Sequence, residues 1–333
     1  MTLLHTAWPT PGNAGQVLGG VVMGDLSRAP DADWPLQRLR VPLLSARAAF
    51  LQEVWHTDGP VASGCSDGIH WRRHADVLYG VVELPEDTCA ATGGTTPLQA
   101  ASQLVYERVF GLLRAQGLPH LWRVWNYLAD INGESHGLER YRQFNQGRYN
   151  AFVQAQRDTG GQVPAACAIG LAAGPLSVAF LAGTSPLVPL ENPRQVSAWN
   201  YPAQYGPRAP TFSRAALAYP RGKEVLFVSG TASIVGHETL HAGDVAAQCV
   251  ESVRNIGCMV QEANRVARSV RPFSLEGLSH RVYVRHAQDA DTVQHTLAPL
   301  LRGATVVCVQ ADICRADLLV EIESQAIHPM PCP

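Results

Sequence analysis

Two kinds of hydrophobic pattern alternate along the chain. Short apolar runs bounded by glycine or proline predict buried strands, and longer stretches with an apolar residue every three or four positions predict helices. In the first half, strands are expected at 17–23, 77–83, 121–128, 165–171 and 176–182, and a helix at 97–115 with Thr95 or Thr96 as its cap. In the second half, strands are expected at 224–229, 278–284, 304–311 and 318–327, and helices at 244–267 and 291–301.

The order strand, helix, strand recurs in both halves, which predicts a duplicated unit. We therefore expect an α+β fold of two fused units, each a mixed sheet with helices packed on one face. The units are placed at residues 1–185 and 186–333. The segment 25–74, which contains several prolines, is expected to be an irregular surface excursion.

Residues 163–190 contain no charged side chain over a length that would cross a bilayer. Glycines and prolines, including the turn signal Gly174-Pro175, cut the stretch into short pieces. We therefore expect two buried strands here and no membrane span.

The composition narrows the classes of function. The chain of 333 residues has a net charge of −2, from 26 basic and 28 acidic residues, so charge alone would not recruit nucleic acid or an anionic membrane. The eight cysteines form no CxxC pair, which fits reduced thiols. No export signal is recognisable, and a cytoplasmic location is expected.

Residues 237–241 read His-Glu-Thr-Leu-His and match the zinc motif HExxH. The motif needs its two histidines one turn apart on a helix, but Gly236 and Gly243 flank it and Asp244 is the expected cap of the next helix. No third ligand stands out downstream. We expect a chance match and no metal site, with a zinc peptidase as the remote alternative.

A dense group of polar and aromatic residues lies at 126–152. If its second part is helical, Tyr141, Asn145 and Arg148 share one face, because their spacings are four and three. A phenol, an amide and a guanidinium converging on one point suit a carboxylate. The alternative is an ordinary solvated helix face.

Two loops offer further candidates. Tyr205, Arg208 and Arg214 lie among prolines and glycines at 201–214, where loops hold a fixed shape and present binding groups, although an ordinary connection fits equally well. Small residues at 229–236, among them Gly230 and Ala232, would let a ligand approach the backbone closely. A plain turn between a strand and a helix is the alternative.

Near the C-terminus, Glu321 and Glu323 alternate with Val320 and Ile322. On a strand the two carboxylates share one face and the apolar pair the other. A glutamate held in a pocket with a raised pKa can act as a general acid at neutral pH, whereas an exposed sheet face would need no chemistry.

Taken together, these segments resemble the chorismatase family, in particular its branch that makes hydroxybenzoates. The resemblance rests on residues 124–133, 137–152, 204–215, 227–236 and 314–323. The family's fold is similar to two fused reactive-intermediate-deaminase (Rid) units, which agrees with the repeat. By analogy with Rid proteins a trimer is one candidate assembly, and no nucleic-acid or membrane partner is expected.

The resemblance implies that the substrate is chorismate, a dianion with a ring carboxylate and an enolpyruvyl ether. Glu321 would be the acid that protonates the ether, and Cys314 would mark the benzoate-forming branch. The implied products are 3-hydroxybenzoate and pyruvate, with 4-hydroxybenzoate as a second product, for the synthesis of aryl-polyene pigments and ubiquinone. No metal or organic cofactor is required.

The dianion needs two cationic clamps. Arg148 with Tyr141, and Arg214 with Tyr205 or Arg208, are the candidates, and which carboxylate each one holds is left open. Two activities remain as alternatives, namely hydrolysis of chorismate to a dihydroxycyclohexadiene carboxylate and deamination of imines in the manner of a Rid protein.

Overall fold

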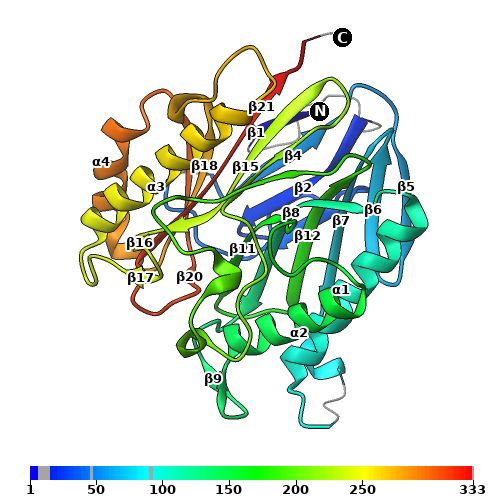
Figure 1. Cartoon of the computed structure of the whole chain (residues 1–333), viewed down its shortest axis with the longest axis horizontal. Helices are drawn as coiled ribbons and strands as arrows, with labels where there is room; N and C mark the ends of the chain where they lie inside the picture. Colours follow the sequence, from blue (N-terminus) through cyan, green and yellow to red (C-terminus); the bar gives the residue numbers. More distant parts are fainter. Residues whose placement is uncertain (7–15, 46–47, 90–92, 332–333) are drawn as a thin grey trace.

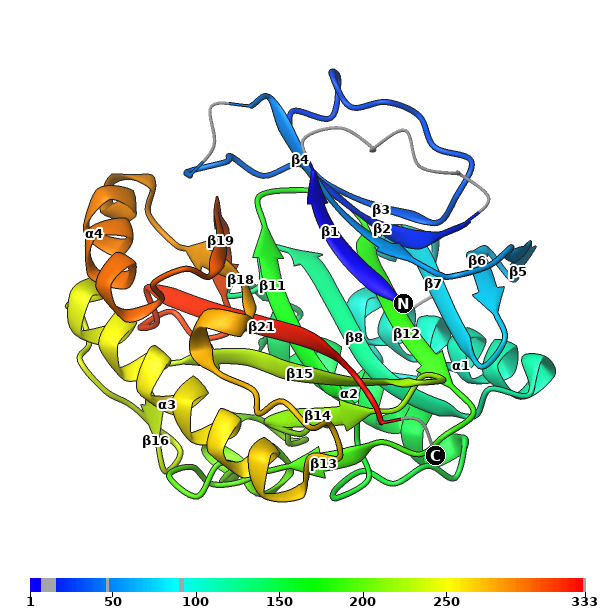
Figure 2. The same cartoon turned by 90° about the horizontal axis from the view of Figure 1, so that it is seen from above.

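The computed structural model describes residues 1–6, 16–45, 48–89 and 93–331. Within these ranges, two large sheets and one smaller sheet form the body of the molecule (Figure 1). Each large sheet carries two helices on its outer face, and the smaller sheet lies across the inner side of both (Figure 2).

The first large sheet has the strand order β20-β11-β8-β12-β7-β6-β5. Helices α1 and α2 cover one face, where their apolar residues pack on the sheet. As expected, Thr96 caps α1, because its side chain accepts a hydrogen bond from the backbone N–H of Gln99. The bounds are β5 Ala62–Ser66, β6 Ile69–His74, β7 Val77–Leu84, α1 Pro97–Gln116, β8 His120–Ala129, α2 Arg140–Gln154, β11 Ala165–Leu171, β12 Leu176–Gly183 and β20 Asp312–Ile313.

The second large sheet has the order β13-β14-β15-β21-β18-β19. Helices α3 and α4 cover its outer face, and Asp244 caps α3 by accepting the N–H of Ala247. The bounds are β13 Val188–Leu190, β14 Ala215–Ala218, β15 Lys223–Ala232, α3 Val245–Val266, β18 Ser279–Val284, α4 Ala290–Leu300, β19 Thr305–Gln310 and β21 Val320–Pro329.

The two large sheets repeat one topology. The order β11-β8-β12-β7 in the first corresponds to β19-β18-β21-β15 in the second. In each, a helix joins the one parallel pair, β8 with β11 and β18 with β19, and the last strand inserts antiparallel beside it. The α+β fold of two related units, each with helices on one face, is therefore confirmed, although the halves share little residue identity.

The expectation of an irregular excursion at 25–74 is wrong. This segment supplies β5 and β6 of the first large sheet, and with β1 and β2 it forms the smaller sheet β1-β4-β2-β3. One local signal, the pair Asp67-Gly68, was available for β5 and β6. Asp67 and Gly68 both have positive φ, 50° and 78°, and form the tight turn between β5 and β6. Strand β4 carries polar residues that find partners inside the protein. The smaller sheet consists of β1 Thr2–Thr6, β2 Val17–Gly24, β3 Leu36–Leu39 and β4 Phe50–His56.

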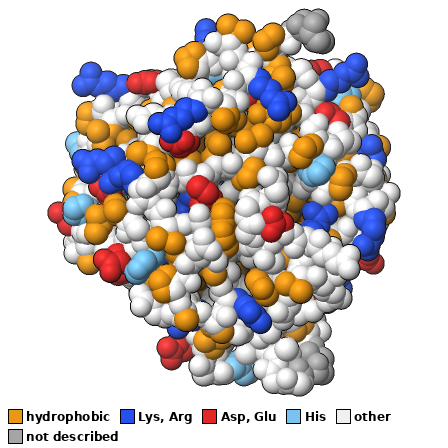
Figure 3. Space-filling view, viewed as in Figure 1, with side chains coloured by type: hydrophobic (Ala, Val, Ile, Leu, Met, Phe, Trp, Pro, Cys, Tyr) orange, Lys and Arg blue, Asp and Glu red, His pale blue; other side chains and the backbone are white. Residues whose placement is uncertain are grey.

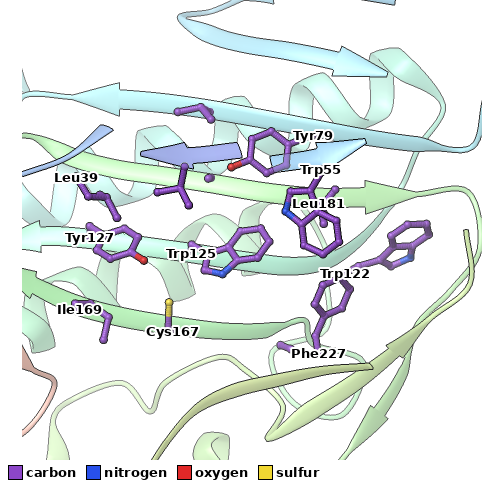
Figure 4. Packing of buried hydrophobic residues seen from close by; sticks show 14 of the residues in the cluster. Leu39, Trp55, Tyr79, Trp122, Trp125, Tyr127, Cys167, Ile169, Leu181 and Phe227 are labelled. Carbon is purple, nitrogen blue, oxygen red and sulfur yellow. The ribbon is translucent and has the colours of Figure 1, made fainter. Parts of the chain in front are cut away.

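One aromatic residue from each sheet meets in the central core (Figure 4). Trp55 of β4 lies 6.4 Å from Trp125 of β8 and 6.0 Å from Phe227 of β15, measured between ring centroids. The smaller sheet therefore packs against the inner faces of both large sheets. This packing restricts the directions of the side chains between them.

The charge-free stretch forms β11 and β12, both buried, as expected. Among the described residues, no helix combines the length and the apolar character that crossing a bilayer requires. On the face shown in Figure 3, basic and acidic side chains are interspersed.

Candidate active site

Glu321 lies on β21, the strand between β15 and β18, and points toward the first large sheet. The alternation expected from the sequence is confirmed, because Val320 and Ile322 pack under the helices while Glu321 and Glu323 face inward. Both carboxylates are nearly inaccessible to solvent, at 4% and 5% exposure. The two glutamates nevertheless have very different surroundings.

Glu323 belongs to a buried ion network. Its carboxylate pairs with Arg123 of β8 and, at 2.7 Å, with Arg281 of β18, and it accepts a hydrogen bond of 2.9 Å from Tyr283. Arg281 in turn pairs with Glu53 of β4. Two arginines and two glutamates thus pair with one another at the junction of the three sheets.

Glu321 has no arginine within ion-pair distance among the described residues. The thiol of Cys314 lies 4.0 Å from its Oε2. Burial raises the pKa of Glu321 to about 8, and the negative charge of Glu323 adds to this effect. The neutral acid therefore predominates at pH 7. Burial likewise raises the pKa of Cys314 to about 12, so its sulfur stays protonated beside the acid.

Glu321 lies where two cavities meet. The outer chamber has a volume of about 360 Å³, within the range of small-molecule sites, roughly 300–1,000 Å³. The inner recess has a volume of about 30 Å³. Both are lined by Tyr141, Phe212, Gly230, Cys314 and Glu321.

Arg148 closes the inner recess. It lies on α2, whose close approach to α1 depends on Gly147, where a Cβ atom would come within 2.1 Å of the Gln99 carbonyl oxygen. The Arg148 guanidinium is 2% exposed and lies 5.1 Å from the centroid of the Tyr106 ring. Its Nε and Nη2 are buried and find no hydrogen-bond partner in the described chain. A buried cation with free donors is costly unless an anion binds there.

The helical face expected at 137–152 is confirmed in part. Tyr141 and Arg148 both line the recess, as their spacing predicted, and burial raises the pKa of the Tyr141 phenol, which stays protonated. Asn145 is buried beneath them and lines neither cavity.

The loop 198–214 forms part of the wall of the outer chamber. Arg214 lines the chamber, and its Nη2 donates to the hydroxyl of Tyr201 at 2.6 Å and to the Val196 carbonyl at 2.9 Å. Its Nε is buried without a partner among the described residues. Tyr205 also lines the chamber, and its hydroxyl donates to the His237 carbonyl.

The role expected for Arg208 is not supported by its position. The chain turns at Gly206, which has a φ of 137°, and carries Arg208 away from the chamber. Arg208 is exposed and lies 4.6 Å from the ring centroid of Tyr149 on the outside of α2. Arg208 is therefore a surface residue and not part of the chamber.

Arg315 occupies the chamber wall instead, although it was not among the residues expected there from the sequence. Its guanidinium lies 4.1 Å from the ring centroid of Tyr205 and 5.2 Å from that of Tyr201. Nη1 donates to the His237 carbonyl at 2.8 Å, and Nη2 is buried and free of partners in the part of the chain that is described. The one available signal was its place directly after Cys314.

The HExxH match does not form a helix. Instead, a short hairpin lines the chamber, in which β16 (Ile234–Val235) pairs with β17 (Glu238–Thr239). Elsewhere in the chain, a second short hairpin pairs β9 (Glu134–Ser135) with β10 (Leu138–Glu139). The carbonyl of His237 accepts a hydrogen bond from Tyr205 at 2.7 Å, and His241 has a positive φ of 59°. The spacing of two imidazoles along one helix turn, on which the motif depends, is therefore missing.

Gly230 and Ala232 lie on β15 opposite Glu321, at a register shift between Val228 and Thr231. A Cβ atom on Gly230 would come within 1.8 Å of Glu321 Oε1. Glycine is therefore required at this position for the acid to lie where it does. Ala232 lines the outer chamber, as the small residues of this loop suggested.

Comparisons with known proteins agree with this arrangement. Residues 53–182 match the family model "Chorismatase FkbO/Hyg5-like, N-terminal". A chorismatase of Streptomyces rapamycinicus is 43% identical over 278 residues, covering 81% of this chain and 80% of that protein. The chain belongs to the chorismatase family. A 3-hydroxybenzoate synthase of Streptomyces hygroscopicus is 35% identical over 316 residues, covering 92% of this chain and 90% of that one.

A crystal structure of a chorismatase matches the whole fold, with a TM-score of 0.84 and 35% sequence identity over 98% of both chains. Membership in the chorismatase family makes this chain an enzyme. The sequence resemblance to the family is thereby confirmed, whereas its assignment to aryl-polyene or ubiquinone synthesis stays a prediction.

Proposed function

We propose that this chain converts chorismate to 3-hydroxybenzoate and pyruvate, with 4-hydroxybenzoate as a second product. The observation that supports this most strongly is the charge pattern of the site. Arg148, Arg214 and Arg315 each have a buried N–H group without a partner in the described residues, and they line the two cavities that contain an acid neutral at pH 7. Such a site favours a small dianion that must receive a proton.

Glu321 transfers its proton to the methylene carbon of the enolpyruvyl group. The carbon bonded to the ether oxygen becomes an oxocarbenium ion, and the arginine that holds the adjacent carboxylate keeps the anion beside this new cation. A water oxygen adds to the cation, and the proton that this water releases returns to Glu321. The resulting hemiketal breaks the bond between its carbon and the ether oxygen, which stays on the ring as a hydroxyl group, and pyruvate departs. The transferred proton ends in the methyl group of pyruvate.

Aromatisation of the ring completes the reaction. The two products together contain all the atoms of chorismate, so the conversion consumes no water, oxidant or reductant overall. One ring hydroxyl group leaves together with the hydrogen of the neighbouring carbon as water, which balances the water molecule added before. If the ring intermediate is released from the site before it has lost water, the product is the dihydroxycyclohexadiene carboxylate of the hydrolase reaction instead.

We assign Cys314 to the choice between these products. Its protonated thiol lines both cavities and lies beside Glu321, so it faces the ring during turnover. The resemblance to the benzoate-forming branch supports this role. By the same resemblance, the benzoate would enter the synthesis of aryl-polyene pigments or ubiquinone.

The test is incubation of the protein with chorismate, followed by chromatographic separation of the products and enzymatic determination of pyruvate. Wild type should release pyruvate in an amount equal to 3-hydroxybenzoate and 4-hydroxybenzoate together. Glu321→Gln should lower the rate about 100- to 10,000-fold, the usual contribution of a general acid, while exposed Glu276→Gln should not. Chorismate left unchanged by wild type would refute the proposal.

The role of Cys314 is tested in the same assay. Cys314→Ala should shift the products from 3-hydroxybenzoate toward the dihydroxycyclohexadiene carboxylate without a matching loss of pyruvate. Cys258→Ala is the matched control, because Cys258 lies on α3 and lines neither cavity. An unchanged product ratio in Cys314→Ala would remove the assignment.

A further inference from the structure

Arg285 makes an unusually complete set of hydrogen bonds. It directly follows β18, and its side chain is only 10% exposed. Its guanidinium donates five hydrogen bonds, as many as it has N–H groups. A planar guanidinium held at every donor has little freedom to reorient, so Arg285 is a fixed point for the elements that it contacts.

Three of the five acceptors are backbone carbonyls in or next to the connection 314–319, which joins β20 to β21. Nη2 donates to the carbonyl of Ile313 at 3.1 Å and to that of Arg315 at 2.8 Å. Nε donates to the carbonyl of Leu318 at 2.8 Å. Since Ile313 and Arg315 are the two neighbours of Cys314 in the sequence, the backbone is held on both sides of the thiol.

The other two acceptors attach Arg285 to the first large sheet. Nη1 donates at 2.7 Å to the carboxylate of Asp312 on β20 and at 3.1 Å to the side-chain oxygen of Asn132, which follows β8. Arg285 itself extends the pairing of β18 with β21, because its backbone N–H donates to the carbonyl of Leu319 at 3.0 Å. One side chain therefore joins both large sheets to the connection that carries Cys314.

The connection depends on such outside contacts for its shape. Residues 314–319 form neither helix nor strand, so no ladder of backbone hydrogen bonds fixes their path. The thiol of Cys314 nevertheless lies 4.0 Å from Oε2 of Glu321. A displacement of about 1 Å in a reacting group can cost about 100-fold in rate. Loss of Arg285 would remove the donor from three carbonyls around the thiol and free the connection to move.

We infer that Arg285 is a positioning residue for product choice, which it controls by fixing the backbone on both sides of Cys314. Arg285 lines neither cavity, so it acts through the thiol and not on the substrate. The inference rests on the proposed function, including the role of Cys314, and extends it by the residue that holds this thiol beside Glu321.

The first test measures the ratio of hydroxybenzoate to dihydroxycyclohexadiene carboxylate formed from chorismate. In Arg285→Met this ratio should fall about 10- to 100-fold, the cost of a displacement of up to about 1 Å. The positive charge of Arg285 lowers the pKa of Glu321, so its removal keeps the acid protonated at pH 7. Pyruvate release should therefore fall less than the product ratio does.

The second test asks whether Arg285 acts through Cys314. Cys314→Ala alone and the double variant of Arg285→Met and Cys314→Ala should give the same product ratio, because a displaced thiol and a missing thiol have the same consequence. Independent effects of the two residues would multiply instead. A further fall of the ratio in the double variant would overturn the inference.

Arg72→Met is the matched control. Arg72 is 8% exposed, pairs with Asp33 at 3.2 Å and donates to the carbonyl of Val17 at 3.0 Å, but it lines neither cavity. Its replacement should lower the free energy of unfolding and leave the product ratio at the wild-type value. The ratio is set within each turnover, so a smaller folded fraction does not change it. An equal fall of the ratio in Arg72→Met would contradict a specific role of Arg285.

Arg285→Lys guards against a methionine variant that does not fold. Lysine keeps the charge but has one nitrogen, which cannot reach all five acceptors, so the ratio should again fall. A wild-type ratio in Arg285→Met, or in Arg285→Lys if the methionine variant does not fold, would overturn the inference.

The outcomes separate this inference from the proposed function. If wild type forms hydroxybenzoate and Cys314→Ala shifts the ratio while the Arg285 variants do not, the inference fails and the proposed function stands. If Cys314→Ala leaves the ratio unchanged, the role of Cys314 fails and the inference fails with it. If wild type does not act on chorismate, the proposed function and the inference both fail.

Discussion

The free energy of unfolding of Glu321→Gln should increase relative to that of wild type as the pH rises. In the unfolded chain the carboxyl has its ordinary pKa of 4.5, whereas in the folded protein burial raises the pKa to about 8. Between these values the folded state holds a proton that the unfolded state has lost. The free energy of unfolding of wild type therefore falls as the pH rises through this window, and it stops falling above pH 8.

The size of the effect follows from the same two pKa values. Each pH unit between them contributes about 1.4 kcal/mol, and the interval from pH 6 to pH 8 lies fully inside the window. Between pH 6 and pH 9, Glu321→Gln should gain about 3 kcal/mol of stability relative to wild type. A pH-independent effect of the substitution itself, such as a changed contact with Cys314, cancels in this comparison.

The assay is urea unfolding of both proteins at pH 6 and pH 9, followed by tryptophan fluorescence. Glu276→Gln is the matched control, because Glu276 is exposed and its replacement should leave the difference from wild type the same at both pH values. If the stability difference between Glu321→Gln and wild type is also equal at pH 6 and pH 9, Glu321 does not carry a raised pKa. The assignment of Glu321 as a neutral acid would then be refuted.

Three further predictions concern turnover, the ion network and the zinc motif. Pyruvate release should fall about tenfold for each pH unit above pH 8 as Glu321 ionises, and a rate that stays constant to pH 10 would contradict the acid role. Glu53→Gln should lower the free energy of unfolding by about 3–5 kcal/mol, because it leaves Glu323 as the single anion between two buried arginines, and urea unfolding at pH 7 would show no such loss if the network were unimportant. Exhaustive dialysis against a chelator should leave the turnover of wild type and of His237→Ala unchanged. If wild type lost turnover and added zinc restored it, residues 237–241 would be supported as a zinc site.

Much of the fold could be predicted because its signals are local. The stripe of apolar residues and the capping Thr96 predicted α1, and the alternation around Glu321 predicted which side chains of β21 face the interior. The repeat of strand, helix and strand predicted the two related sheets. These features depend on neighbours a few residues apart in the sequence.

The smaller sheet could not be predicted for the opposite reason. Strand β4 carries Gln52 and Glu53 among its apolar residues, which reads as a surface segment. In the fold, Glu53 pairs with Arg281, which lies 228 positions further along the chain. A polar residue that finds a buried partner at such a distance leaves no local trace.

The candidate site shows the same division. Tyr141 and Arg148 were found because helical spacing places them together. Arg208 was wrongly expected in the chamber, because the direction of a loop rich in glycine and proline depends on its turns. Arg315 was missed, because it lies in another connection, between β20 and β21, where no local pattern indicates a binding residue.

The proton on Glu321 can be observed directly by infrared difference spectroscopy as the pH is changed. The account predicts one protonated carboxyl group at pH 7 that disappears with a midpoint near pH 8 and is absent from Glu321→Gln. A Glu321 that is already ionised at pH 7, with identical spectra for wild type and Glu321→Gln in the carboxylic acid region, would contradict it.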